Sequence, residues 1–150
     1  WINPEIDILA IQKKIDTDSI SGMINNVDII LDCLDNLETR LILNQYAVEN
    51  KIPLIYGGIW GLEGRMTFIK TPETPCLNCL FTESFETGQF PVLGATPGVI
   101  GTLQAMETIK YLVGMGDNMK NQLLIWDGFS NNFNMVSLNK NPDCKICNMT

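Results

Sequence analysis

Apolar and polar positions divide the chain into short segments with two different periods. Three apolar runs are too short for helices and carry many branched side chains, so each predicts a strand; they cover residues 6–11, 27–33 and 52–56. The middle run places apolar residues at consecutive positions, which is typical of a buried strand. A polar segment over residues 16–22 predicts a short helix or a loop.

A helix is predicted between the second and third of these strands. Apolar residues recur at helical spacing over residues 37–48, and Pro53 prevents the helix from continuing much beyond Asn50. Asp35 stands where a helix N-cap is expected, and Glu38 follows three residues later, as in a capping box. Strand, helix and strand in about thirty residues make a βαβ unit, which predicts a parallel, right-handed crossover.

The second half of the chain predicts strands and one long helix. Alternating residues over 65–70 predict a strand joined to its predecessor by a hairpin-like turn, and residues 71–96 are rich in loop-forming residues. A helix is expected to begin at Pro97 and to end at Gly114. One face of this helix is apolar and carries Leu103, Met106, Ile109 and Val113, and the other carries Gln104, Glu107 and Thr108. Two late strands follow, over residues 122–126 and 133–138.

These elements predict a single α/β domain over residues 1–150. Its sheet is expected to be Rossmann-like, with parallel strands at the start and antiparallel strands later.

Charge and hydropathy exclude two kinds of partner. The formal net charge is −7 and the chain has no histidine, so a phosphate backbone would be repelled and nucleic acid is not expected as a partner. No apolar run is long enough to cross a bilayer, and the first residues lack a basic signal-peptide region. We therefore expect a cytoplasmic protein without a membrane partner.

Because the chain opens at Trp1 rather than at a methionine, we also expect it to be a truncated part of a longer sequence.

Four of the five cysteines form two C-x-x-C pairs, Cys76 with Cys79 and Cys144 with Cys147. Each pair puts two thiolates on one tight turn, and two such turns supply the closed tetrahedral site of a structural zinc ion. Disulfides or free thiols are the alternative, but an odd number of cysteines without a secretion signal disfavours a disulfide framework. The fifth cysteine, Cys33, ends an apolar strand and predicts a buried core thiol rather than a nucleophile.

Asp35 and Asn36 follow the carboxyl end of a predicted strand, where open α/β sheets bind ligands. From the local pattern alone, Asp35 can be a helix cap, a Mg²⁺ ligand or both. The glycine-rich residues 57–61 are not expected to bind phosphate, because a strand rather than a helix is predicted to follow them.

Several motifs occur together in one order. They are Asp32-Cys33-Leu34-Asp35-Asn36-Leu37-Glu38-Thr39-Arg40, Pro53 to Gly58, Gly64-Arg65-Met66-Thr67, Pro75 to Phe81, Pro97 to Ala105, Asp127-Gly128 and Cys144 to Cys147. The first resembles a D-x-x-D-N-x-x-T-R segment of the ThiF/MoeB/HesA family, which comprises the ubiquitin-activating-enzyme-like adenylyltransferases. The later motifs follow in that family's order, so the chain resembles the C-terminal portion of such an enzyme.

The resemblance implies a reaction. Members of the family bind ATP and Mg²⁺ on a Rossmann-like sheet. The C-terminal carboxylate of a ubiquitin-like or sulfur-carrier protein then attacks the α-phosphate, giving an acyl-adenylate and pyrophosphate. Asp35 matches the magnesium-site aspartate and is the implied catalytic residue, and Asp35 with Asn36 would contact the nucleotide. Cys76, Cys79, Cys144 and Cys147 match the zinc ligands. A homodimer is also implied.

Two departures from the family pattern limit what this chain can do alone. The Gly-rich nucleotide loop and its strands precede anything in this sequence, so the isolated chain is expected to be inactive. Residues 82–96 contain no cysteine, so no thioester is expected. The competing hypothesis is a non-enzymatic, zinc-stapled module for dimerisation or partner binding. An NAD-dependent dehydrogenase domain is disfavoured, because the sequence has neither a dinucleotide fingerprint nor a catalytic histidine.

Overall fold

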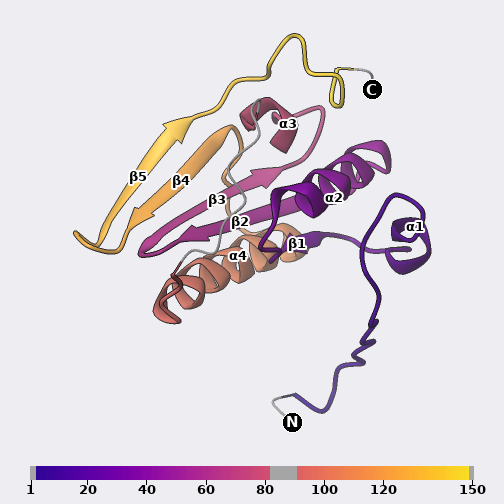
Figure 1. Ribbon diagram of the computed structural model, residues 1–150, viewed down its shortest axis with the longest axis horizontal. Coiled ribbons are helices and arrows are strands. Elements are labelled where there is room, and N and C mark those ends of the chain that lie inside the picture. Colours follow the sequence, from indigo (N-terminus) through magenta and orange to yellow (C-terminus); the bar gives the residue numbers. More distant parts are fainter. Residues whose placement is uncertain (1–2, 82–90, 149–150) are drawn as a thin grey trace.

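The computed structural model describes residues 3–81 and 91–148. Their backbone contains an open five-stranded sheet in which the strands lie in chain order (Figure 1). The strands are β1 (Ile30–Asp32), β2 (Leu54–Trp60), β3 (Glu63–Ile69), β4 (Gln122–Asp127) and β5 (Asn132–Ser137). β1 and β2 run parallel, and every later pair of neighbours is antiparallel. This confirms the α/β class and the mixed sheet that begins parallel.

Four helices accompany the sheet in the described part of the chain. They are α1 (Ile20–Met23), α2 (Leu37–Glu49), α3 (Leu77–Leu80) and α4 (Ala95–Val113). The end of α2 agrees with the prediction from Pro53, and Gly114 caps α4 with a left-handed φ of 64°. α3 lies within the segment predicted to be loop-rich; residues 82–90 of that segment lie outside the described residues. No described helix combines the length and the apolar character that a membrane span needs.

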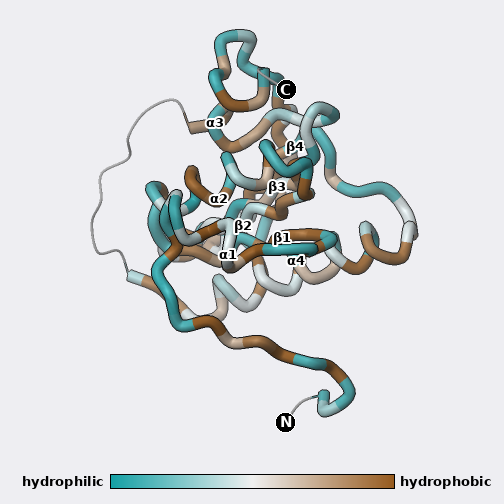
Figure 2. The backbone as a smooth tube through the Cα atoms, turned by 90° about the vertical axis from the view of Figure 1, so that its right-hand side faces the viewer, coloured by the Kyte–Doolittle hydropathy of each residue, from teal (hydrophilic) through white to brown (hydrophobic). Residues whose placement is uncertain are grey.

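Adjacent glycines in β2 show how closely two helices approach the sheet. A Cβ on Gly57 would collide with Gln104 of α4, and one on Gly58 would meet Tyr56 and then Arg40 of α2. Because neighbouring residues of a strand point to opposite faces, α2 and α4 cover opposite faces of the sheet. Figure 2 shows the resulting three layers, with the strands between the two helices.

Each layer boundary contains its own buried cluster. The α2 side holds the larger one, which joins α2, the sheet and the cysteine-bearing turns through Leu43, Val48, Leu54, Tyr56, Leu77 and Cys147. The α4 side holds Ile55, Met66 and Phe68, with Leu103 and Tyr111 packed against them. The two turns that carry the paired cysteines are therefore part of the main core rather than attached to its surface.

The predicted strand over residues 6–11 is wrong. These residues carry no regular structure, and Ile8 and Leu9 are 79% and 84% exposed. The segment runs away from the body of the molecule (Figure 2). An apolar extended run becomes a strand only when another strand offers its backbone hydrogen bonds, and no described strand lies beside this one. The predicted strand over 27–33 is shorter than expected for a related reason. β1 pairs only with β2, and Leu31 remains exposed.

The apolar face of α4 is not the face that packs against the sheet. The helix buries Thr96, Ile100, Gln104 and Glu107, whereas Met106, Ile109 and Val113 are exposed and Leu103 is only partly buried. Glycines in the sheet decide which side of the helix packs. Gly57 and Gly64 leave room for the side chains of Gln104 and Ile100, so these residues enter the space above the strands. Helical periodicity finds an apolar stripe but does not contain this information.

Candidate functional site

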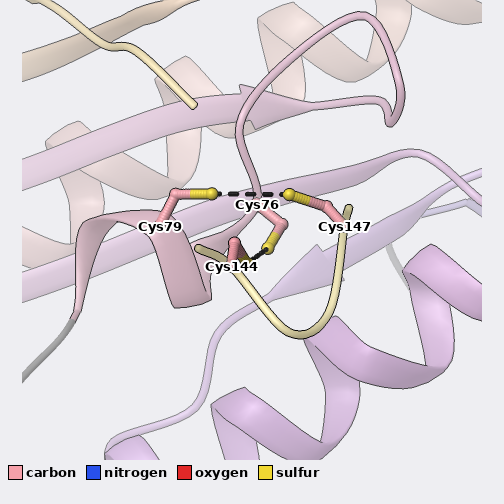
Figure 3. Close-up of side chains that lie close together, drawn as sticks. All are labelled: Cys76, Cys79, Cys144 and Cys147. Atoms are coloured by element: carbon pink, nitrogen blue, oxygen red, sulfur yellow. Dashed lines mark hydrogen bonds between the residues drawn. The ribbon is translucent and has the colours of Figure 1, made fainter. Parts of the chain in front are cut away.

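The four paired cysteines converge. Cys76 precedes α3 and Cys79 lies within it, while a turn near the C-terminus carries Cys144 and Cys147. All four sulfur atoms lie within 4.8 Å of one another. Figure 3 shows the side chains pointing to a common centre, with the Sγ atoms of Cys76 and Cys144 separated by 3.7 Å and those of Cys79 and Cys147 by 3.4 Å.

These distances distinguish a metal site from disulfides. A disulfide needs an S–S distance of about 2.05 Å, and all five cysteines are free thiols. A tetrahedral zinc ion with Zn–S bonds of about 2.3 Å places its sulfur ligands about 3.8 Å apart. The two measured separations are close to that value. The cluster therefore fits one tetrahedral metal ion, and four sulfur ligands would leave no open position for a substrate.

The thiols have opposed ionisation tendencies. Burial, against a hydrogen bond with Asn44, raises the pKa of Cys76 to about 11, and burial also raises the pKa of Cys147. Burial opposes ionisation of Cys144 as well, but backbone N–H groups of Cys147 and Ile146 outweigh it and lower the pKa of Cys144 to about 7. Several thiolates so close together repel one another, and a divalent cation removes that penalty.

Asn44 positions the first cysteine turn and was not singled out from the sequence. Its side chain is fully buried on α2. Its Oδ1 accepts a hydrogen bond from the backbone N–H of Leu77 at 3.0 Å, and its Nδ2 donates to Asn78 Oδ1 at 2.7 Å. An amide among the apolar positions of a predicted helix is the signal that could have found it, because a buried polar group needs partners.

The segment that follows β1 carries the predicted nucleotide-site residues. Asn36, not Asp35, is the N-cap of α2, and its Oδ1 accepts from the Thr39 N–H at 2.9 Å. The N-cap is therefore one residue later than predicted, and the predicted Asp35–Glu38 capping box is wrong. The two candidates are equally good caps, so the sequence could not distinguish them.

This shift leaves the Asp35 carboxylate free of a capping role. Asp35 is exposed at the carboxyl end of β1, and within the described chain its hydrogen-bond partner is Asn36 Nδ2, at 3.2 Å from Asp35 Oδ1. It does not join the cysteines: among described residues, they form the one group of three or more potential His, Cys, Asp or Glu ligands. Mg²⁺ often takes one or two protein carboxylates and fills its remaining positions with substrate phosphates and water.

A buried ion pair lies directly beneath this segment. Arg40 Nη1 is 3.5 Å from Asp32 Oδ2, and the guanidinium carbon lies 4.9 Å from the centre of the Tyr56 ring. Burial raises the pKa of Asp32 to about 6, against the opposing effects of Arg40 and of the Leu34 N–H group. The resemblance motif contained both charged residues, but no sequence pattern showed that they would be buried together.

The prediction that Cys33 is a core thiol is wrong, because the residue is exposed. β1 ends at Asp32, so Cys33 lies just beyond the strand and not inside it. Partial burial and the Asp32 carboxylate raise the pKa of the Cys33 thiol, although Arg40 opposes them. A thiol with a raised pKa is mostly protonated at neutral pH and is a poor nucleophile.

The open mixed sheet, a solvent-facing acidic side chain after a strand's carboxyl end and a cluster of four cysteines that could hold a metal ion define a Rossmann-like α/β protein. Residues 1–146 match the ThiF family, and the chain belongs to that family. This confirms the resemblance that the motifs indicated.

Two curated relatives illustrate the match. The SAMP-activating enzyme E1 of Haloferax volcanii is 34% identical over 152 residues, covering 97% of this chain and 56% of that protein. The adenylyltransferase and sulfurtransferase MOCS3 of Aedes aegypti is 35% identical over 153 residues, covering 97% of this chain and 35% of that protein. The chain thus spans about half or less of the length of these relatives.

The fold also occurs among solved structures. The crystal structure of E. coli MccB with ATP superimposes with a TM-score of 0.77 at 15% identity, covering 91% of this chain and 44% of that chain. At this identity the likeness supports the fold alone.

Proposed function

We propose that this chain is the C-terminal part of an ATP-dependent adenylyltransferase that activates the C-terminal carboxylate of a ubiquitin-like or sulfur-carrier protein. Membership of the ThiF family carries the proposal, because the relatives named above include an activating enzyme and an adenylyltransferase. The structure supports it at one position. Asp35 presents an exposed carboxylate that does not cap α2, just beyond the carboxyl end of a parallel strand, which is where open α/β sheets bind ligands.

Asp35 would hold Mg²⁺, and Asn36 would line the nucleotide site while its Oδ1 caps α2. Mg²⁺ bound there supplies positive charge beside the phosphates of ATP. The partner's carboxylate is already ionised at neutral pH, so attack on the α-phosphate needs no general base from this chain. The contribution of the protein is then to position the reactants and to neutralise charge.

The cysteine cluster has a structural role in this proposal. Cys76, Cys79, Cys144 and Cys147 would bind one zinc ion as thiolates and hold the C-terminal turn against α3. The protein would work in the cytoplasm, where thiols stay reduced, and as a homodimer.

One observation favours the second candidate, a non-enzymatic module for dimerisation or partner binding. Apolar side chains are exposed on α4 and on β5, namely Met106, Ile109, Leu112, Val113, Phe133, Met135 and Val136. Exposed apolar surface of this kind is common at protein–protein interfaces, but an enzyme with a protein substrate needs such a surface too.

A protein that joins this chain to the N-terminal nucleotide-binding part that the proposal requires is expected to catalyse ATP–pyrophosphate exchange only when its carrier-protein partner is present. On this proposal the backbone N–H groups that cradle the phosphates come from the N-terminal part, so residues 1–150 alone are expected to fold but not to catalyse the exchange. A partner with an amidated C-terminus is the matched control and should be inert. Strong ATP binding by residues 1–150 alone would show that the nucleotide site has been misplaced.

No thioester is expected between this chain and the partner. Residues 82–96 have no thiol, and Cys33 has a raised pKa. Cys33→Ala should therefore leave both adenylation and the pattern of conjugates unchanged on a non-reducing gel. A reductant-sensitive conjugate in the wild type that disappears in Cys33→Ala would contradict this expectation.

A further inference from the structure

We propose that Asp32 and Arg40 are positioning residues that fix the Leu34 backbone and thereby hold Asp35 in place. The effect on Mg²⁺ binding rests on the proposed function. The contacts of Asp32 and Arg40 with the Leu34 backbone, called the clamp below, do not depend on it. Asp32 Oδ1 accepts a hydrogen bond from the Leu34 N–H at 2.9 Å, and Arg40 Nη2 donates one to the Leu34 carbonyl oxygen. One residue thus has its backbone donor and its backbone acceptor held by two buried side chains.

The clamp acts where the sheet stops supporting the chain. β1 ends at Asp32, so the following residues have no ladder partner there. Asp35 comes directly after the clamped Leu34 and directly before Asn36, which is fixed as the α2 cap. The backbone on both sides of Asp35 is therefore restrained, and its carboxylate is held near the carboxyl end of β1 without a direct partner in the clamp.

Three elements hold the clamp itself. Arg40 stands in the first turns of α2 and lies over the Tyr56 ring of β2. On the other face, Gln104 of α4 donates to the backbone oxygens of Asp32 and Ile55, at 2.9 and 3.1 Å. Asp32 is fully buried and Arg40 is 9% exposed.

The geometry of the ion pair argues against a purely stabilising role. Burying two charges costs solvation energy that only close, fully hydrogen-bonded contact recovers, and apolar replacements are often as stable. Here Asp32 Oδ2 and Arg40 Nη1 are 3.5 Å apart, and neither atom has a hydrogen-bond partner within the described chain. The hydrogen bonds that the pair does make go to Leu34, so its arrangement serves the segment that carries Asp35.

The test uses the complete gene product and two measurements. Arg40→Met keeps the apolar volume of the stem and removes the donor. It is expected to increase amide hydrogen exchange of residues 33–36, measured by mass spectrometry. It is also expected to raise the Mg²⁺ concentration for half-maximal ATP–pyrophosphate exchange by about tenfold, the scale on which partners of metal ligands act. Lys110→Met is the control, since it removes the cation from the Glu107 pair on α4.

The two measurements distinguish failure of the clamp from failure of the proposed function. If the wild type shows no pyrophosphate exchange, the proposed function fails, while hydrogen exchange still decides whether the clamp exists. Unchanged protection of residues 33–36 in Arg40→Met, or an equal loss in Lys110→Met, overturns the clamp. If Arg40→Met does not fold, Arg40→Lys decides. Arg40→Lys retains the cation beside Asp32 but lacks the planar guanidinium that also reaches Leu34. Faster amide hydrogen exchange of residues 33–36 is therefore expected, and wild-type protection of these amides would overturn the inference.

Discussion

Asp35→Asn is expected to reduce partner-dependent ATP–pyrophosphate exchange in the complete enzyme by about a hundredfold or more, while the melting temperature changes by less than about 2 °C. A neutral amide binds Mg²⁺ more weakly than a carboxylate, and lost charge stabilisation at a reacting phosphate has effects of this size. Stability should be preserved because Asn36, not Asp35, caps α2. An exposed substitution away from a cap usually changes the free energy of unfolding by about 0.5 kcal/mol or less.

Asn36→Ala is the matched variant for this prediction. It removes the cap and is expected to lower the free energy of unfolding by about 1 kcal/mol, which a thermal or urea melt detects. The pair of variants separates metal binding from capping in adjacent residues. Wild-type pyrophosphate-exchange activity in Asp35→Asn would show that Asp35 is not a metal ligand. A decrease of about 1 kcal/mol in the free energy of unfolding of the same variant would show that Asp35 stabilises the helix.

Cys144→Ser is expected to have the largest effect on stability. The wild type should contain one zinc ion per chain after purification without added metal, measured by elemental analysis. Losing one thiolate should abolish most of the zinc and lower the free energy of unfolding by at least about 3 kcal/mol, because metal binding at such a site is partly folding energy. The buried position of Cys144 adds to the loss, since the serine hydroxyl would be enclosed by the other three thiols.

Cys33→Ser provides the control for this experiment. Cys33 is exposed and lies outside the cluster, so this variant should retain full zinc and melt close to the wild type. A chelator should destabilise the wild type and Cys33→Ser alike and change Cys144→Ser little. Folded, reduced wild-type protein with almost no zinc would exclude the metal assignment and leave four packed thiols to be explained.

The sequence predicted features that depend on local pattern and failed where neighbours decide. Helix α2 ended where Pro53 required, and the strands β2 to β5 were all found, because period and breakers are properties of the segment itself. The cysteine cluster was found because C-x-x-C spacing encodes a turn. The misplaced cap differed by one residue, between two side chains that cap equally well.

The remaining errors share a cause in tertiary packing. The strand over residues 6–11 needed a neighbour that the described sheet does not provide, and β1 stayed short with only β2 beside it. The buried side of α4 was chosen by Gly57 and Gly64, which lie in strands distant from it in sequence. The Asp32–Arg40 pair required knowledge that a charged residue on α2 faces the sheet, which amphipathic pattern alone would have placed in solvent.

The cysteine cluster also has a topological consequence. Cys76 and Cys144 are 68 positions apart, and the chain between them includes α4, β4 and β5. All six residues of β5 are exposed, and the segment after it returns toward α3 (Figure 1). An ion that joins the two turns closes this stretch into a ring, and by a chain-entropy estimate a closure of that length disfavours the unfolded state by about 4 kcal/mol. The edge strand β5 would then be held in the sheet less by burial of its own side chains than by this closure, which joins the chain before it to the chain after it.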